Sequence, residues 1–173
     1  TMWRIDRVAD KIKRGDISIG THSMFGWGGG MLTELYGTVG FDMVWIDTEH
    51  GAIDKSTLMN MLIGCAVNNM AAFVRVAWND KVLAKPILDM GADGIIFPMV
   101  LDAEQARAAV AACQYPPDGV RGWGPVRNMK YGAVGLDAYK EQAKKVWTVI
   151  QIEDIRAVEN IDSILAVEGL NAI

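Results

Sequence analysis

Short apolar runs alternate with longer amphipathic segments along most of the chain. The apolar runs carry few charges and are rich in valine, isoleucine and phenylalanine, which is typical of parallel strands that are covered on both faces. The longer segments have apolar positions at helical spacing, and several begin at an aspartate that predicts a helix N-cap. The pattern predicts strands at 17–23, 41–47, 72–77, 94–100 and 146–152, and the start of a sixth at 170–173.

Helices are predicted between these strands, at 2–14, 28–36, 55–68, 79–91, 102–113, 136–145 and 155–167. Asp54, Asp80 and Asp102 are the expected N-caps. Pro86 lies inside the fourth helix and is expected to kink it or to break it in two, because proline lacks the N–H that a helix interior requires. The stretch 114–135 is rich in proline and glycine and is predicted to be a long loop.

The repeated strand–helix order predicts an α/β fold, either a (β/α)8 barrel or a doubly wound sheet. A barrel needs eight strands and typically about 250 residues, whereas this chain ends inside the sixth predicted strand. The expectation is therefore a single domain over residues 1–173 that carries about six strand–helix units of a barrel and is truncated after the start of strand six.

Charged groups at the strand ends favour the barrel. The second strand leads into Asp47, Glu49 and His50, and the third carries Arg75 among apolar residues. Isolated charges are costly to bury, so they are expected to project into a cleft. In barrels the carboxyl ends of all the strands form one rim, and active sites are assembled there from several strands. The fifth predicted strand adds Glu153 to the same end.

Composition narrows the functional class. The chain is 51% hydrophobic and 22% charged with a net charge of −4, and this disfavours a general nucleic-acid binder. No apolar run reaches the length of a membrane span, and the first residues lack a signal-peptide pattern. Cys65 and Cys113 lie in apolar, helix-like contexts and are interpreted as reduced core thiols of a cytoplasmic protein.

Six motifs in order carry a family resemblance. They are FD-x-x-x-ID-x-EH (41–50), VRV-x-WND (74–80), LD-x-GA (88–92), PMV (98–100), YPP-x-G-x-RG (115–122) and VIQIE (149–153). Together they resemble the HpcH/HpaI family of metal-dependent aldolases, from about Gly20 to the last residue. The family resemblance implies a (β/α)8 barrel, assembled as a homo-hexamer that exchanges a terminal helix between its subunits.

The resemblance also implies roles for individual residues. Glu153 matches one of two carboxylates that bind Mg²⁺, Mn²⁺ or Co²⁺, and the second carboxylate is expected beyond Ile173. Arg75 matches the arginine that stabilises the pyruvate enolate; from the sequence alone it could instead form an ion pair with Asp47 or Glu49. His50 matches the acid/base residue. Three further residues complete the expected site. Asp47 and Asp89 match carboxylates that orient or charge the histidine, and Gln151 matches a residue near the metal or is a plain strand-end hydrogen bonder.

The remaining candidate comes from the long loop, where Arg121 is expected to bind the distal carboxylate of a sugar acid because loops after barrel strands shape substrate pockets. None of the nine lysines falls in a predicted strand, which disfavours a Schiff-base aldolase and favours the metal route.

The expected function is a metal-dependent lyase that reversibly cleaves a 4-hydroxy-2-oxo acid, such as a 2-keto-3-deoxy sugar acid, into pyruvate and an aldehyde. The alternatives are an oxaloacetate-type decarboxylase with the same enolate chemistry, or a non-catalytic fragment of a barrel. Small-molecule 2-oxo acids and aldehydes are the expected partners, with neither nucleic acid nor membrane.

Overall fold

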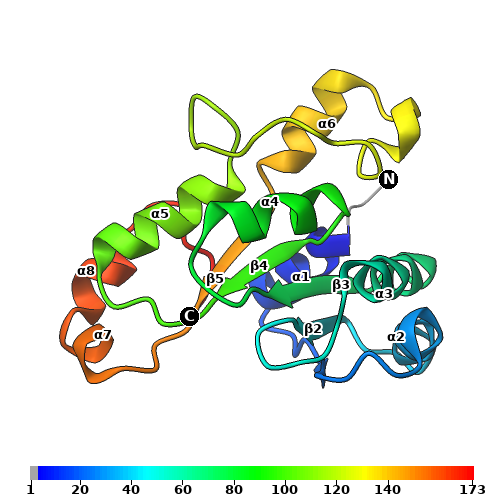
Figure 1. Cartoon of the computed structure of the whole chain (residues 1–173), viewed down its shortest axis with the longest axis horizontal. Helices are drawn as coiled ribbons and strands as arrows, with labels where there is room; N and C mark the ends of the chain where they lie inside the picture. The colour runs from blue at the N-terminus through cyan, green and yellow to red at the C-terminus, as the bar shows by residue number, and fades with distance from the viewer. Residues whose placement is uncertain (1–3) are drawn as a thin grey trace. The chain divides into compact units, whose positions relative to one another are not determined.

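The computed structural model describes residues 4–173, in which helices alternate with short strands (Figure 1). The predicted first helix begins at residues 2 and 3, which lie outside the described part of the chain. The elements are α1 (Arg4–Lys13), β1 (Gly20–Ser23), α2 (Gly29–Thr38), β2 (Met43–Asp47), α3 (Lys55–Val67), β3 (Ala71–Arg75), α4 (Lys81–Asp89), β4 (Gly94–Phe97), α5 (Ala103–Cys113), the 3₁₀ helix η1 (Lys130–Gly132), α6 (Leu136–Ala143), β5 (Trp147–Ile150), α7 (Ile155–Glu159) and α8 (Ile161–Leu165).

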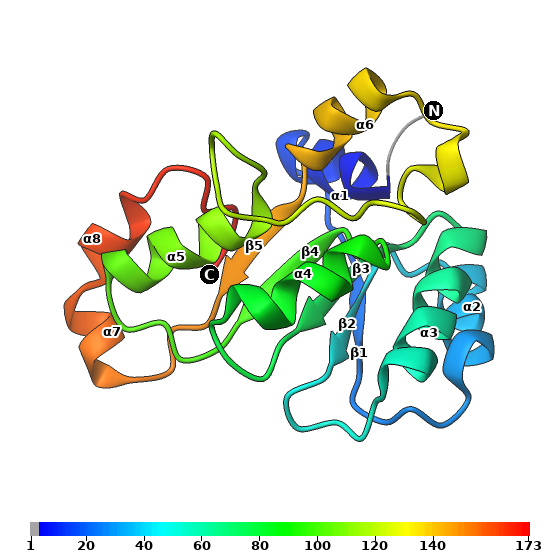
Figure 2. The same ribbon diagram turned by 45° about the horizontal axis from the view of Figure 1, so that its top comes forward.

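The strands follow one another in the order β1-β2-β3-β4-β5. β1 pairs with β2, and β4 with β5, in parallel (Figure 2). Gly20 lies opposite Met43 in the first pair, and Gly94 opposite Trp147 in the second. A doubly wound sheet reverses its strand order at a switch point, whereas a barrel keeps chain order. The α/β fold of the barrel type is therefore confirmed, and the doubly wound alternative is wrong.

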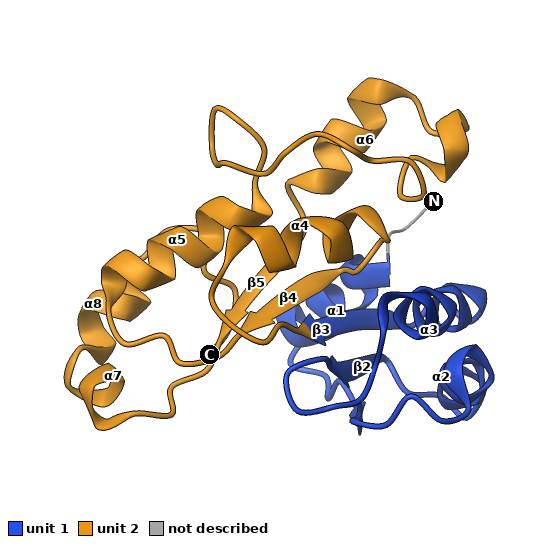
Figure 3. Ribbon diagram, in the orientation of Figure 1, with its two compact units in different colours: residues 1–74 blue, residues 75–173 orange. Residues whose placement is uncertain are grey.

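The chain forms two compact units, residues 1–74 and residues 75–173 (Figure 3). In the first unit, α2 packs closely on α3 because small residues line the contact. A Cβ atom on Gly64 would lie 2.2 Å from the carbonyl oxygen of Gly30 and 2.3 Å from Oγ1 of Thr33. The Thr33 hydroxyl donates to the Met61 carbonyl at 2.8 Å, so its buried polar group is satisfied.

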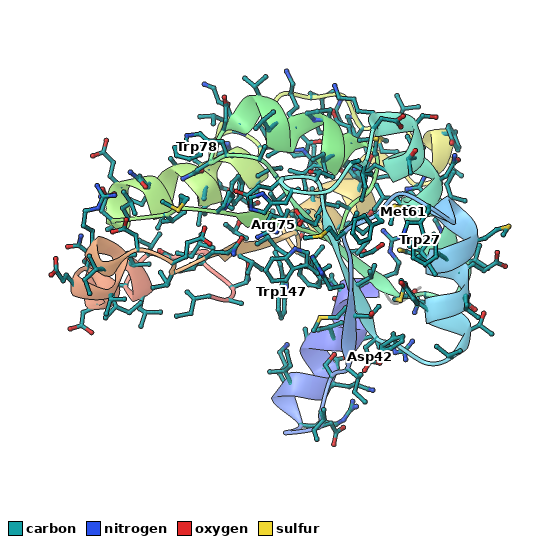
Figure 4. The ribbon with its side chains drawn as sticks, turned by 60° about the horizontal axis from the view of Figure 1, so that its bottom comes forward. Trp27, Asp42, Met61, Arg75, Trp78 and Trp147 are labelled. Carbon is teal, nitrogen blue, oxygen red and sulfur yellow. The ribbon has the colours of Figure 1, made fainter. Side chains whose placement is uncertain are left out.

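Helix α1 is joined to the amino end of β2 through Asp42, which is 1% exposed (Figure 4). The Asp42 carboxylate pairs with Arg7 and Lys11 of α1, each at 2.8 Å, and accepts the main-chain N–H of Ile19 at 2.9 Å. Burial by itself raises the pKa of Asp42, but the hydrogen bonds from Lys11 and Ile19 and the charges of Arg7 and Lys11 outweigh it, so the pKa is lowered.

In the second unit, α5 packs against α4, β5 and α8. Its buried face consists of small side chains, Ala106, Ala109, Ala112 and Cys113. Such a face lets the helix lie close to the sheet. The resulting core is filled by large strand residues, including Ile95, Phe97 and Ile150.

The predicted N-caps are confirmed. The side chains of Asp54, Asp80 and Asp102 each accept a main-chain N–H from the first turn of α3, α4 and α5. The strands are shorter than predicted. The hydrophobic pattern predicts which extended residues are buried, whereas a strand ends where its backbone hydrogen bonds to the neighbouring strand end. β5 illustrates this: it ends at Ile150, although the N–H of Gln151 still donates to the Phe97 carbonyl at 2.9 Å.

Two helix predictions need correction. Pro86 does not break α4, which runs without interruption from Lys81 to Asp89. One N–H is lost at the proline, but its carbonyl still accepts the N–H of Met90 at 3.0 Å, so the last turn is held. The predicted helix at 155–167 is instead α7 and α8, which meet at Asn160. The Asn160 side chain donates to the Leu101 carbonyl at 3.0 Å, which ties the junction to the loop before α5.

The end of the chain agrees with the predicted start of a sixth strand. Ala172 forms a parallel bridge with Val149 of β5, and its carbonyl accepts the N–H of Ile150 at 3.2 Å. Cys65 and Cys113 are buried free thiols, as predicted, and burial raises the pKa of Cys113 to about 11. Among the described residues, no helix combines the length and apolar character that crossing a membrane would require.

Candidate active site

Three of the predicted site residues lie together at the carboxyl ends of strands in the second unit. Arg75 is the last residue of β3, and Gln151 and Glu153 follow β5. Nη1 of Arg75 donates to Oε1 of Gln151 at 3.3 Å, and Nε2 of Gln151 donates to Oε2 of Glu153 at 3.3 Å. The Gln151 amide thus links the Arg75 cation to the Glu153 carboxylate. Its oxygen accepts from the cation, and its nitrogen donates to the carboxylate. Arg75 is labelled in Figure 4.

The other carboxylate oxygen of Glu153 is held by the main chain. Oε1 accepts the N–H of Met99 at 2.8 Å. Met99 follows β4 and has a φ of 54°, in the left-handed region that few non-glycine residues adopt. Sequence reasoning missed this contact, because it comes from a backbone atom and the residues 97–99 read only as an apolar strand end. The positive φ of a methionine leaves no sequence signal.

Glu153 remains exposed although both of its oxygens accept hydrogen bonds. Each oxygen of a carboxylate has two lone pairs, so acceptor capacity remains. Hard oxygen donors of this kind suit Mg²⁺ or Mn²⁺. Across residues 4–173, however, no group of three or more His, Cys, Asp or Glu side chains is close enough to hold a metal ion. A cation bound at Glu153 would therefore need ligands beyond the described His, Cys, Asp and Glu groups.

A second group of predicted site residues follows β2 in the first unit. Asp47 is fully buried, and its Oδ1 accepts the main-chain N–H groups of Glu49 at 3.0 Å and His50 at 3.3 Å. These bonds shape the turn that carries the His50 ring. The side chain of His50 is 63% exposed, and its Nε2 lies 3.6 Å from Oε2 of Glu49. An exposed imidazole with a carboxylate neighbour suits a role in proton transfer.

Asp47 also approaches the other histidine of the chain. Nε2 of His22 lies 3.9 Å from Oδ2 of Asp47, and the His22 ring stands edge-on to Trp45 at 5.8 Å between centroids. Asp47 was expected to orient or charge His50, and the hydrogen bond between them runs through the His50 backbone. His22 is thus also a neighbour of the Asp47 carboxylate. The parallel register, which pairs His22 with Trp45, is the feature that brings them together.

Asp89 lies elsewhere in the second unit. It is the last residue of α4, which leads into the amino end of β4, whereas Arg75, Gln151 and Glu153 lie at carboxyl ends. Its Oδ1 accepts a hydrogen bond from Nη2 of Arg121 at 3.0 Å. Within this unit the structure separates Asp89 from the Arg75–Gln151–Glu153 group, although the sequence motifs had placed all four in one site.

Arg121 is enclosed by the long loop and α6. Its side chain is 1% exposed, its Nη2 also donates to the Tyr139 hydroxyl at 3.3 Å, and its guanidinium carbon lies 4.4 Å from the centre of the Tyr115 ring. Burial, together with the hydrogen bond to Tyr139, raises the pKa of Tyr115, so its hydroxyl stays protonated. A guanidinium so enclosed does not face solvent, and its expected contact with a substrate carboxylate remains a prediction.

The parallel strands in chain order, with ionisable side chains after their carboxyl ends, define an α/β protein of the barrel class with a strand-end site. The model of the HpcH/HpaI aldolase/citrate lyase family matches residues 30–173. The chain therefore belongs to this family, as the sequence motifs indicated.

Three curated relatives are aldolases. The 2-dehydro-3,6-dideoxy-6-sulfogluconate aldolase of Pseudomonas putida is 38% identical over 94% of this chain and 63% of its own length. The hydroxypyruvate/pyruvate aldolase of Sagittula stellata is 36% identical over 82% of this chain and 56% of its own length. The 5-keto-4-deoxy-D-glucarate aldolase of Klebsiella pneumoniae is 36% identical, with 82% and 55% covered. The chain thus spans less than two thirds of the length of each relative.

Solved structures agree on the fold. The HpcH/HpaI aldolase from Desulfitobacterium hafniense superposes with a TM-score of 0.87 at 28% identity, over 99% of this chain and 65% of its own. Macrophomate synthase superposes with a TM-score of 0.78 at 26% identity, over 96% of this chain and 58% of its own.

Proposed function

We propose that the protein containing this chain is a metal-dependent aldolase, a carbon–carbon lyase that reversibly cleaves a 4-hydroxy-2-oxo acid, such as a 2-keto-3-deoxy sugar acid, into pyruvate and an aldehyde. Its curated relatives are named as aldolases of sugar acids and of pyruvate or hydroxypyruvate. The single observation that carries the proposal is the hydrogen-bonded series Arg75–Gln151–Glu153, which combines a cation for an enolate with a carboxylate for a metal.

Glu153 is the proposed protein ligand of a divalent cation, Mg²⁺, Mn²⁺ or Co²⁺, and a second carboxylate is proposed beyond Ile173. The donor chemistry fits, since Glu153 offers hard oxygen atoms on an exposed side chain that is held from both sides. When bound, such an ion would act as a Lewis acid toward the 2-oxo group. The hydrogen bonds from Met99 and Gln151 orient the carboxylate before a ligand arrives.

Arg75 is the proposed stabiliser of negative charge on the oxygen of the pyruvate enolate. A guanidinium is always protonated and presents donors in a planar fork, so it can meet a developing oxyanion without reorganisation. The Gln151 carbonyl oxygen receives one of its N–H groups and restrains the fork. This contact supports a role for Gln151 in substrate binding through the position of Arg75.

His50 is the proposed acid/base residue, which would take up and return the proton of the hydroxyl group derived from the aldehyde. Its exposed ring can be reached by a substrate, and its backbone is held by the buried Asp47. Asp47 is thus proposed to orient His50 through the turn. The proposed role of Asp89 in charging the histidine, and that of Arg121 in binding the far end of a sugar acid, rest on the family motif and the loop position alone.

The same reasoning extends to the assembly. We propose one barrel domain, a homo-oligomer of the hexameric type that the family resemblance implies, and a cytoplasmic location that suits the two free cysteines.

The test uses the natural, full-length protein and a panel of 4-hydroxy-2-oxo acids, with pyruvate release measured by a coupled dehydrogenase. Cleavage is expected to stop when the metal is removed with EDTA and to return when Mg²⁺ or Mn²⁺ is added. Full activity in excess EDTA, or a lysine adduct trapped by borohydride, would contradict the proposal. Release of CO₂ from oxaloacetate without any aldol cleavage would favour the decarboxylase instead.

A further inference from the structure

We propose that Met99 is a positioning residue of this site: the left-handed turn at Met99 holds its main-chain N–H on Oε1 of Glu153, and with the Gln151 amide on Oε2 it orients the carboxylate for a divalent cation. The inference rests on the proposed role of Glu153 as a metal ligand. It deepens that role, because it concerns what makes the carboxylate a good ligand.

The conformation of Met99 is unusual for its residue type. Its φ of 54° lies where the Cβ atom of an L-residue approaches the following carbonyl oxygen. The other described non-glycine residues with positive φ are Asn69, Lys130 and Tyr131. Asn69 belongs to a type that tolerates this region, and the other two lie in or at the 3₁₀ turn η1. Of these four residues, Met99 is the one whose main-chain N–H donates to a predicted site residue, Glu153.

Pairing between β4 and β5 explains why the turn matters. Phe97 pairs with Ile150, and the Phe97 carbonyl accepts the N–H of Gln151. Continuing this parallel ladder would direct the Met99 N–H to the Gln151 carbonyl. Instead, the peptide between residues 98 and 99 presents that N–H to Glu153 at 2.8 Å.

The positive φ at Met99 then returns the chain to the core, because the next residue, Val100, is fully buried. A residue that cannot adopt this φ must either displace Val100 or rotate the peptide and withdraw its N–H from Glu153. The left-handed turn at Met99 and the hydrogen bond from its N–H to the Glu153 carboxylate are therefore coupled.

The contacts restrain both oxygens of the Glu153 carboxylate. Glu153 is exposed and lies outside the helices and strands, so these two hydrogen bonds are its described polar restraints. One oxygen is held by a backbone amide, and the other is held by Gln151, whose far end bonds Arg75. Groups that orient a metal ligand in this way typically change metal affinity by about 10- to 100-fold when they are lost.

The experiment measures Mn²⁺ affinity of the full-length protein by electron paramagnetic resonance, independently of activity. Met99→Val keeps the N–H and an apolar side chain, but a β-branched residue is a poor fit to φ 54°. It is expected to weaken Mn²⁺ binding by at least about tenfold. Met99→Gly and Met99→Asn adopt positive φ readily and keep the N–H, so both are expected to bind Mn²⁺ within about twofold of the wild type.

The matched control is Asn69→Val. Asn69 has the same φ of 54° but follows α3, so this variant is expected to lower the thermal midpoint and leave the Mn²⁺ affinity unchanged. If Met99→Val does not fold, replacing the Met99 amide by an ester removes the donor and keeps the side chain. The ester variant is also expected to bind Mn²⁺ about tenfold more weakly.

The outcomes separate this inference from the proposed function. Met99→Val or the ester variant binding Mn²⁺ like the wild type would overturn the inference alone. Equal weakening in Met99→Gly, Met99→Asn and Met99→Val would also overturn it, since the side chain and not the turn would then be responsible. A wild-type protein that binds no Mn²⁺ would overturn the proposed metal function, and the inference with it.

Discussion

The buried pair of Arg121 and Asp89 offers a sharp energetic test of the second unit. Asp89→Ala removes the carboxylate that accepts from Nη2 of Arg121 at 3.0 Å. The arginine side chain is 1% exposed and the aspartate side chain 23% exposed, so water can reach the aspartate more readily than the guanidinium. Removing Asp89 therefore leaves a buried cation without its counter-ion.

The size of the effect follows from what remains around the guanidinium. Breaking a buried ion pair from one side typically costs about 3–5 kcal/mol. Arg121 keeps the Tyr139 hydroxyl at 3.3 Å and the face of Tyr115 at 4.4 Å, and these contacts offset part of the loss. Its Nε has no hydrogen-bond partner even with Asp89 present. We expect Asp89→Ala to lower the free energy of unfolding by about 3 kcal/mol, equivalent to a fall of roughly 6–12 °C in the melting temperature.

A double-mutant cycle with Arg121→Met identifies the pair as the cause. Arg121→Met removes the cation and leaves the more exposed Asp89 unpaired. The unpaired charge is therefore expected to lower the free energy of unfolding less than it does in Asp89→Ala. The double variant has no unpaired buried cation and should be less destabilised than the sum of the single variants, with a coupling of roughly 1–3 kcal/mol. Urea unfolding at one fixed protein concentration measures all four proteins.

The reasoning fails if Asp89→Ala lowers the free energy of unfolding by less than about 0.5 kcal/mol, the range of an ordinary surface substitution. It also fails if the losses of the two single variants simply add in the double variant. The same proteins address the proposed chemistry. Turnover of Asp89→Ala measured well below its melting temperature separates a role in catalysis from a role in holding Arg121.

Two further predictions concern Asp42 and the division of labour between Arg75 and His50. Asp42→Asn should lower the free energy of unfolding by roughly 1.5–3 kcal/mol at pH 7. Because the folded pKa of Asp42 is lowered, its contribution is present above the unfolded pKa and lost as pH falls through the folded value. The urea midpoints of variant and wild type should therefore converge on acidification below the ordinary pKa of aspartate, and a constant difference would contradict this. Arg75→Ala should slow aldol cleavage and oxaloacetate decarboxylation alike by about 10²–10³. His50→Ala should slow cleavage by about 10²–10⁴ and decarboxylation much less, and equal losses in paired assays would remove the proton-transfer role.

The sequence by itself determined the succession of strands and helices and the residue types at the strand ends. Apolar runs and aspartate caps report local preferences, and tertiary structure reinforces them, so Asp54, Asp80 and Asp102 cap the helices as predicted. The ordered motifs were also enough to identify the family, because their residue types and gaps can be read directly along the chain. Local signals were weaker where a proline or an asparagine competes with helix hydrogen bonding. There the predicted break at Pro86 and the predicted single helix at 155–167 were wrong.

Tertiary structure decided which of these residues meet. Strand order in the sheet rests on hydrogen bonds between segments distant in sequence, so the structure confirmed the barrel order that the strand-end charges and the motifs had only favoured. It placed Arg75, Gln151 and Glu153 together, and it put Asp89 with the buried Arg121 at the other end of the strands. Met99 reaches Glu153 through its backbone, which every residue type shares, and a positive φ at methionine follows no local preference. That contact arises because pairing between β4 and β5 and the burial of Val100 together outweigh the local preference of the chain.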